Sequence, residues 1–367
     1  MAEKGIIIAW LTLLPAVVLG GGLAHGAPLD EFLTAQHGYP PWHGEWEVGM
    51  DVMNGKLDLL NLRKKDQDFS GTTVGDYTGW HALGGIAVTR RLWVDGGVWD
   101  RSIMTPLDTA ESVGWQVGAQ YQFTVNVDNL PALALRWTRW GNSGQEVEKK
   151  SATTLRGITA DKIAIKGPGD RQTQIDLLAT WMRGENDSFS LFYGQGWSKV
   201  NYDKLLVTLR GECVYDVDSP NPQQFKGFLV SGDPDFCEVL SFDLHDEGGA
   251  FPGKGMGAAY DARYVHFGGM YQWLDDKWRT RLGMRFQKHD RDVEDSVHRF
   301  GRTTYDNNLT IVGDVGYKIF KESGLVFRIE LMKNQFVGDI PFTYNTFSSN
   351  RFNRKYGFLT IAWVSGF

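Results

Sequence analysis

The chain has 367 residues, of which 42% are hydrophobic, and its mean hydropathy of -0.31 excludes a bundle of transmembrane helices. Its 44 glycines and 13% aromatic residues suit either a barrel with one face in lipid or a soluble all-β protein. The formal net charge of -6 argues against nucleic acid as a partner. The sequence contains neither CxxC nor a haem-attachment motif, so we expect no cofactor.

The first 26 residues have the anatomy of an export signal. Lys4 precedes a long apolar run, and small residues at Ala24 and Gly26 match the spacing of a signal-peptidase site. A permanent membrane anchor is the alternative, because the apolar run is nearly long enough to span a bilayer. We predict a signal peptide over residues 1–26.

Apolar and polar residues alternate along many later segments. In the clearest case, Leu282, Met284 and Phe286 fall on one face of a strand while Arg285 and Gln287 fall on the other. A helix would mix these two sets around its circumference. The alternation predicts twelve strands, and ten to fourteen are compatible with it. They lie near residues 45–59, 80–91, 92–103, 113–125, 131–141, 171–183, 188–202, 257–273, 277–290, 305–320, 324–336 and 356–367.

Short and long connections alternate between these strands. This order is typical of a membrane barrel with short periplasmic turns and long extracellular loops. It is not expected of a soluble β-sandwich. The predicted fold class is therefore all-β, a transmembrane antiparallel up-and-down β-barrel over residues 45–367. Its longest extracellular loop covers about 204–256, and a periplasmic leader over 27–44 either stays in the periplasm or enters the lumen.

The end of the chain alternates up to a terminal phenylalanine. The residues concerned are Leu359, Ile361, Trp363, Ser365 and Phe367. In this ending, and in its strand pattern, the chain resembles bacterial outer-membrane β-barrel proteins as a class, although Ser365 departs from the usual apolar residue. The resemblance implies a location in the bacterial outer membrane, contact with outer-membrane lipid, and recognition of Phe367 by the outer-membrane assembly machinery.

Charged residues gather on the predicted inner face of the barrel. Three arginines at alternating positions of one strand repel one another unless anions or carboxylates lie nearby. One interpretation is a charged pore that attracts small anionic solutes, and the other is a network of arginines and carboxylates that fills the lumen. The candidate lumen and selectivity residues are Arg279, Arg281, Arg285, Arg328, Glu330, Glu47 and Asp51.

Export places Cys213 and Cys237 in an oxidising compartment, which predicts a disulfide between them. The many acidic residues around this pair favour a solvated surface loop over a cation site or a constriction of the lumen. A second cluster from His289 to His298 contains no cysteine and no HExxH motif, so no metal site is predicted.

The simplest function for such a barrel is a porin-like channel for passive diffusion of small polar solutes. If the charged-pore interpretation holds, these solutes are anionic. No GxSxG or compact Ser-His-Asp motif is present, so no catalytic residue is proposed and an enzyme is not expected. A triad assembled from distant strands stays compatible with the sequence. The alternative function is a non-conducting barrel that acts as a lipid hydrolase or as a structural partner of an envelope complex.

Overall fold

The computed structural model describes thirteen stretches of the chain. These are residues 32–35, 40–53, 77–104, 109–127, 130–150, 154–155, 158–184, 186–221, 224–237, 239–245, 260–291, 306–333 and 355–365. The predicted signal peptide over 1–26 and the terminal Phe367 lie outside these stretches.

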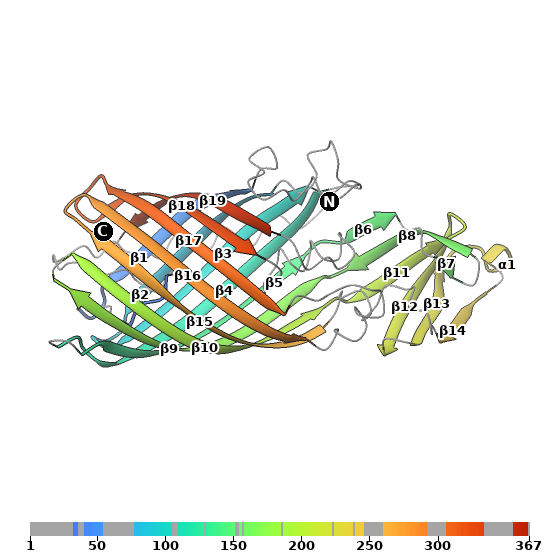
Figure 1. Ribbon diagram of the computed structural model, residues 1–367. Coiled ribbons are helices and arrows are strands. Elements are labelled where there is room, and N and C mark those ends of the chain that lie inside the picture. The colour runs from blue at the N-terminus through green and yellow to red at the C-terminus, as the bar shows by residue number, and fades with distance from the viewer. Residues whose placement is uncertain are drawn as a thin grey trace.

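Twelve antiparallel strands close into a barrel (Figure 1). Each strand pairs with its neighbours along the chain, and β1 pairs with β19 from Glu47↔Val364 to Val52↔Leu359, which closes the ring. The predicted fold class and the predicted number of strands are confirmed. The barrel strands are β1 (Gly44–Met53), β2 (Tyr77–Ala87), β3 (Leu92–Met104), β4 (Thr109–Thr124), β5 (Ala132–Gly144), β9 (Gly169–Arg183), β10 (Asp187–Asn201), β15 (Tyr260–Leu274), β16 (Trp278–Arg291), β17 (Asn307–Lys318), β18 (Ser323–Lys333) and β19 (Lys355–Ser365).

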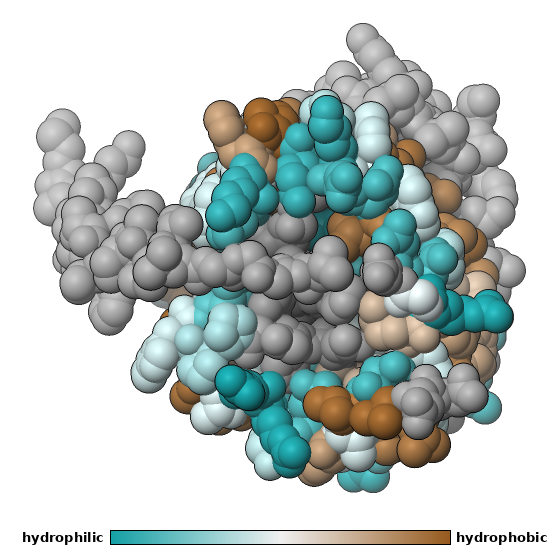
Figure 2. All heavy atoms as spheres, turned by 90° about the vertical axis from the view of Figure 1, so that its left-hand side faces the viewer, coloured by the Kyte–Doolittle hydropathy of each residue, from teal (hydrophilic) through white to brown (hydrophobic). Residues whose placement is uncertain are grey.

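The outer wall of the barrel is apolar and the inner wall is polar. Along β16, Leu282 and Met284 are exposed while Arg279, Arg281 and Gln287 are buried, as the two-residue period requires. Figure 2 looks onto the end that carries the short turns; polar residues gather on the side that faces the viewer and apolar residues on the flanks. Such a wall buries its apolar side chains only when lipid surrounds it.

Aromatic side chains form a band near the short-turn end. The rings of Trp278 and Tyr317 pack against each other at a tilt, with centroids 4.7 Å apart. The ring centroid of Phe320, in the β17–β18 turn, lies 5.8 Å from that of Trp363 on β19. Aromatic rings at this height match the interfacial girdle of membrane barrels, where the ring meets lipid and its polar edge meets water.

Large inward side chains are accommodated above glycines on neighbouring strands. A Cβ atom at Gly85 would lie 2.4 Å from Cζ2 of Trp93, and one at Gly194 would lie 2.1 Å from Oδ1 of Asp176 and 2.2 Å from Nε2 of His266. The glycines therefore provide the space in which these side chains lie against the wall. This packing accounts for part of the high glycine content.

A second sheet extends from the end of the barrel opposite the short turns (Figure 1). It continues the wall directly, because β8 leads into β9, β11 follows β10, and β8 pairs with β11. At the junction Gly167 has φ +58°, and a Cβ there would clash with Asp203. The elements outside the barrel are β6 (Val147–Lys150), β7 (Thr154–Leu155), β8 (Ile158–Lys166), β11 (Lys204–Leu209), β12 (Cys213–Asn221), β13 (Gln224–Ser231), α1 (Pro234–Cys237) and β14 (Ser241–His245).

The stretch predicted as the longest loop, about 204–256, thus contains four strands and a short helix, while residues 246–256 lie outside the described stretches. Cys213 at the start of β12 and Cys237 at the end of α1 are at disulfide distance, with Cα atoms 5.7 Å apart. Both belong to the apolar core of this sheet, together with Leu205, Val207 and Tyr215. Among the described residues, no helix is long and apolar enough to cross a membrane.

The glycine packing predicts a large difference between two adjacent substitutions on β2. Gly85→Ala should destabilise the barrel by about 1–3 kcal/mol, because the new methyl group meets the Trp93 ring. Gly84→Ala is the matched control, since a Cβ there would lie 3.7 Å from its nearest neighbour, the Glu45 carbonyl oxygen. The temperature at which the folded gel band converts to the unfolded band should fall only in Gly85→Ala. Equal midpoints in the two variants would contradict this account.

The disulfide should stabilise the second sheet and leave the barrel unaffected. In Cys213→Ala/Cys237→Ala the sheet should lose about 3 kcal/mol, the value that the loop-entropy argument gives for a closed loop of this size. Limited proteolysis of the folded protein should then cut faster between residues 204 and 245, while the barrel keeps its unfolding temperature. A parallel fall in the barrel's midpoint would show that the two parts do not unfold independently.

Candidate functional site: the barrel lumen

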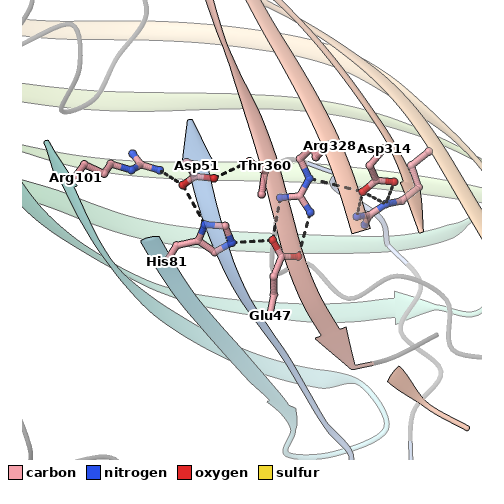
Figure 3. A network of polar contacts seen from close by, with 8 residues as sticks. Glu47, Asp51, His81, Arg101, Asp314, Arg328 and Thr360 are labelled. Carbon is pink, nitrogen blue, oxygen red and sulfur yellow. Dashed lines mark hydrogen bonds and ion pairs between the residues drawn. The ribbon is translucent and has the colours of Figure 1, made fainter. Parts of the chain in front are cut away.

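Inward-facing charges from several strands meet in one network (Figure 3). Its centre is Glu47 on β1, whose carboxylate accepts two hydrogen bonds of 3.0 Å from the guanidinium of Arg328 on β18. Glu47 also lies 3.0 Å from Nε2 of His81 on β2. All three side chains are buried, so each charge is neutralised by a partner and not by bulk water.

His81 links this centre to a second carboxylate. Its Nδ1 lies 3.0 Å from Oδ2 of Asp51, so the ring bridges two acids of the same strand (Figure 3). Asp51 also accepts a 2.6 Å hydrogen bond from the Thr360 hydroxyl, and a guanidinium nitrogen of Arg101 lies 3.7 Å away. Because β1 pairs with both β2 and β19, these contacts span the closing seam of the barrel.

On its other side the network includes Asp314 of β17. Arg281 of β16 donates through Nε and Nη2 to this carboxylate, and Nε of Arg328 lies 3.6 Å from it. Arg281 and Asp314 are paired directly across the ladder, as are Asp314 and Arg328. The strand register therefore places the side chains of Arg281, Asp314 and Arg328 next to one another on the inner wall.

Two further pairs of polar side chains lie elsewhere on the inner wall, and neither pair was predicted from the sequence. Arg136 donates to both carboxylate oxygens of Asp95, at 2.6 and 2.8 Å. His266 bonds through Nε2 to Asp176. The alternation of β3, β5 and β9 was the available signal, but it shows only that a residue faces inward and not which residue faces it.

A segment of the leader lies inside the barrel. Phe32 is 2% exposed and packs against Met270 and Val312 of the wall. The Arg281 guanidinium carbon lies 4.2 Å from its ring centroid, and that of Arg328 lies 5.9 Å away. These are cation–π contacts with two members of the charged network.

The next residues of the segment reach other strands. The backbone N–H of Ala35 donates a 2.8 Å hydrogen bond to the Thr180 hydroxyl, whose oxygen lies 3.1 Å from that of Thr34. The Gln120 side chain donates to the Thr34 carbonyl oxygen at 2.9 Å. Leu33 and Ala35 belong to one buried apolar cluster with Ala132, Ala134, Leu178 and Phe192.

Residues 32–35 therefore contact a continuous arc of the ring, which runs from β18 through β17, β16, β15, β10, β9 and β5 to β4. The two ends of this arc lie on different sides of the ring. Arg281 is near the start of β16 and Thr180 near the end of β9, so the segment lies toward the short-turn end. Of the two positions that the sequence left open for the leader, residues 32–35 occupy the lumen. The apolar pair Phe32–Leu33 in a polar leader was the one signal for this placement.

The predicted lumen residues all fall on the inner face. The network unites Glu47, Asp51, Arg281 and Arg328, with Arg279 buried beside them. Arg285 and Glu330 are half-buried on the same face. The pairing of Arg281 with Asp314, and of Arg328 with Glu47, agrees with the filled-lumen interpretation at these two positions.

Taken together, the closed ring, the apolar outer wall, the aromatic band and the polar lumen identify a membrane barrel. The chain is an outer-membrane β-barrel. It is located in the bacterial outer membrane. We expect the short turns to face the periplasm, which is the usual orientation of this class.

Comparisons with known proteins give distant structural likenesses. Neither a protein family nor a curated protein matches the sequence. Similar solved structures include the β domain of the Bordetella autotransporter BrkA, with TM-score 0.43 and 10% identity over 89% of this chain and 100% of that one. The NanC porin has TM-score 0.41 and 9% identity over 89% and 100% of the two chains. The monoaromatic hydrocarbon channel CymD has TM-score 0.41 and 9% identity over 90% and 89%. Likenesses this distant concern the fold alone.

The second sheet carries paired charges on its surface. Lys204 lies 3.4 Å from Asp216, and Lys226 lies 3.6 Å from Asp243. Burial raises the pKa of the Tyr202 hydroxyl, and the nearby carboxylates raise it further. Within the described stretches no group of three or more His, Cys, Asp or Glu side chains could hold a metal ion, and residues 292–298 of the second predicted cluster lie outside them.

The network predicts strong coupling between Glu47 and Arg328. Glu47→Gln should cost about 3–5 kcal/mol of barrel stability, because it leaves the buried guanidinium of Arg328 without its carboxylate. Glu47→Gln/Arg328→Gln should cost less than the two single changes added together, which urea unfolding in detergent can measure as a coupling energy.

Asp243→Asn provides the control. Its pair with Lys226 is exposed, with side-chain exposures of 51% and 44%, so the change should alter stability by no more than about 0.5 kcal/mol. Additive losses at Glu47 and Arg328 would mean that the pair contributes nothing beyond the separate side chains.

Proposed function

We propose that the protein is an outer-membrane channel for small solutes whose lumen is closed, in the state described, by residues 32–35. The observation that carries the proposal is the position of this segment inside the barrel, in contact with strands on different sides of the ring. We expect the solutes to be small and polar, and the polar inner wall supports that expectation.

The attachment of the segment to the wall is suited to release. Its contacts are side-chain packing, cation–π contacts and a few hydrogen bonds, and residues 32–35 are not part of any strand. Opening therefore breaks no ladder of the barrel. The wall is rigid by comparison, because each barrel strand is paired on both sides.

The charges of the lumen bear on selectivity. Arg281 and Arg328 face Asp314 and Glu47, so these arginines act within ion pairs and not as isolated cations. We therefore propose weak charge selectivity at this level of the lumen, in place of the strong anion preference that an unpaired row of arginines would produce. A reversal potential in a salt gradient measures this property directly.

Weakening the segment should open the channel. In planar bilayers the wild-type protein should be closed for most of the recording, whereas Phe32→Ala/Leu33→Ala should raise the open fraction at least ~10-fold, since two buried side chains that favour the closed state are lost. Phe267→Ala is the matched control, because this phenylalanine is on the outer wall and 56% exposed.

Two outcomes would refute the proposal. If the folded double variant remains as closed as the wild type at every voltage, the wall itself fills the lumen, and the alternative of a non-conducting barrel is favoured. If the wild type and both variants are equally open, residues 32–35 do not control conduction.

A further inference from the structure

The two arginines that contact Phe32 are held by carboxylates of the wall. Arg281 is bonded to Asp314 and Arg328 to Glu47, so both guanidinium groups have partners other than the ring. The ring lies over them at 4.2 and 5.9 Å, using charges that the barrel has already paired and oriented. An arrangement of this kind needs no reorganisation when the ring leaves or when another ring takes its place.

The rest of the site is apolar and closely fitted. Met270 and Val312 are buried against Phe32. At Gly283 a Cβ would be 3.4 Å from Cδ1 and Cε1 of the ring and 3.2 Å from Val312, so the ring lies directly on the backbone of β16. We call these residues, with the two arginines, the ring site. It has the features of a small-ligand site, namely an apolar lining with a few oriented polar groups.

Phe32 reaches this site as part of a segment that is outside the strands, so its ring resembles a tethered ligand more than a wall residue. We propose that the ring site binds small monocyclic aromatic solutes, which compete with Phe32 for it. This inference rests on the proposed function for its consequence, since a solute that displaces Phe32 would favour the open channel. Recognition would come from the flat ring face over Arg281 and from the apolar wall, and burial of Phe32 limits the size to one ring.

A binding experiment tests the ring site without any measurement of conduction. Purified Phe32→Ala, in detergent, is titrated with benzyl alcohol and with cyclohexylmethanol by ligand-detected NMR. The two alcohols have nearly the same size and polarity, and only the first has a π face. We expect Phe32→Ala to bind benzyl alcohol at least ~10-fold more tightly than wild type does, because the tethered competitor is gone. We also expect a preference of ~3-fold or more over cyclohexylmethanol.

Two variants locate the binding. Phe267→Ala removes a ring from the lipid-facing wall and should bind benzyl alcohol no better than wild type. Phe32→Ala/Gly283→Leu fills the vacated space from β16 and should lose the tighter binding. Phe32→Leu keeps apolar volume in the site and should give an intermediate affinity, which keeps the test available if the alanine variant folds poorly.

The site is refuted if Phe32→Ala and Phe267→Ala bind benzyl alcohol equally, if both alcohols bind Phe32→Ala equally, or if Phe32→Ala/Gly283→Leu retains the tighter binding. These results are separable from those on conduction. Aromatic-selective binding by a barrel that never conducts would support the ring site and refute the channel, whereas an opened channel without aromatic preference would do the reverse.

Discussion

Closure of the barrel by the β1–β19 ladder is the constraint on which the rest of the structure depends. Lipid offers no hydrogen bonds, so every backbone group in the wall must find its partner within the sheet, and only a ring has no edge. Once the ring is closed, each inward side chain is confined with the others. Polar groups there must bond to one another or to water, and charges must find opposite charges. The network around Glu47 meets that requirement across the closing seam itself, since its members come from β1, β2, β3, β16, β17, β18 and β19.

The same confinement explains why a segment of the leader is stable inside the lumen. A short peptide outside any strand has little apolar surface to bury on its own, but the inner wall offers it both apolar patches and oriented polar groups. Phe32 uses the guanidinium faces that the ion pairs leave accessible to a ring, and Ala35 uses the Thr180 hydroxyl for its backbone N–H. The charged network and residues 32–35 are thus one physical system, because the ion pairs that stabilise the wall also build the surface on which these residues pack.

The sequence predicts the wall much better than the lumen contents, and the reason is physical. Alternation is a local pattern. The face of the strand on which Leu282 or Arg281 lies follows from the residues immediately beside it, so twelve strands and their inward-facing residues could be predicted. Pairing is not local. Glu47 and Arg328 are 281 positions apart and become neighbours only through ring closure, and the contact of Arg281 with Phe32 joins the wall to the leader. The second sheet was missed for another reason. The many acidic residues around Cys213 and Cys237 favoured a solvated loop, whereas the apolar residues between them pack on one face of a sheet whose pairing with β8 is not local in sequence.

A channel closed by its own chain differs from one closed by a separate plug in its energetics. The closing ring is tethered, so its effective concentration at the ring site is on the order of millimolar whatever the protein concentration. A solute that competes for the same place must therefore be abundant or must bind more tightly than a single phenylalanine side chain. Competition with the tethered ring therefore lowers the apparent affinity of the site for the solute, which favours release of the solute after passage. The closed state returns when the solute is depleted. In such a device recognition and gating use the same few contacts, and Phe32 over Arg281 is the contact at which the two would meet.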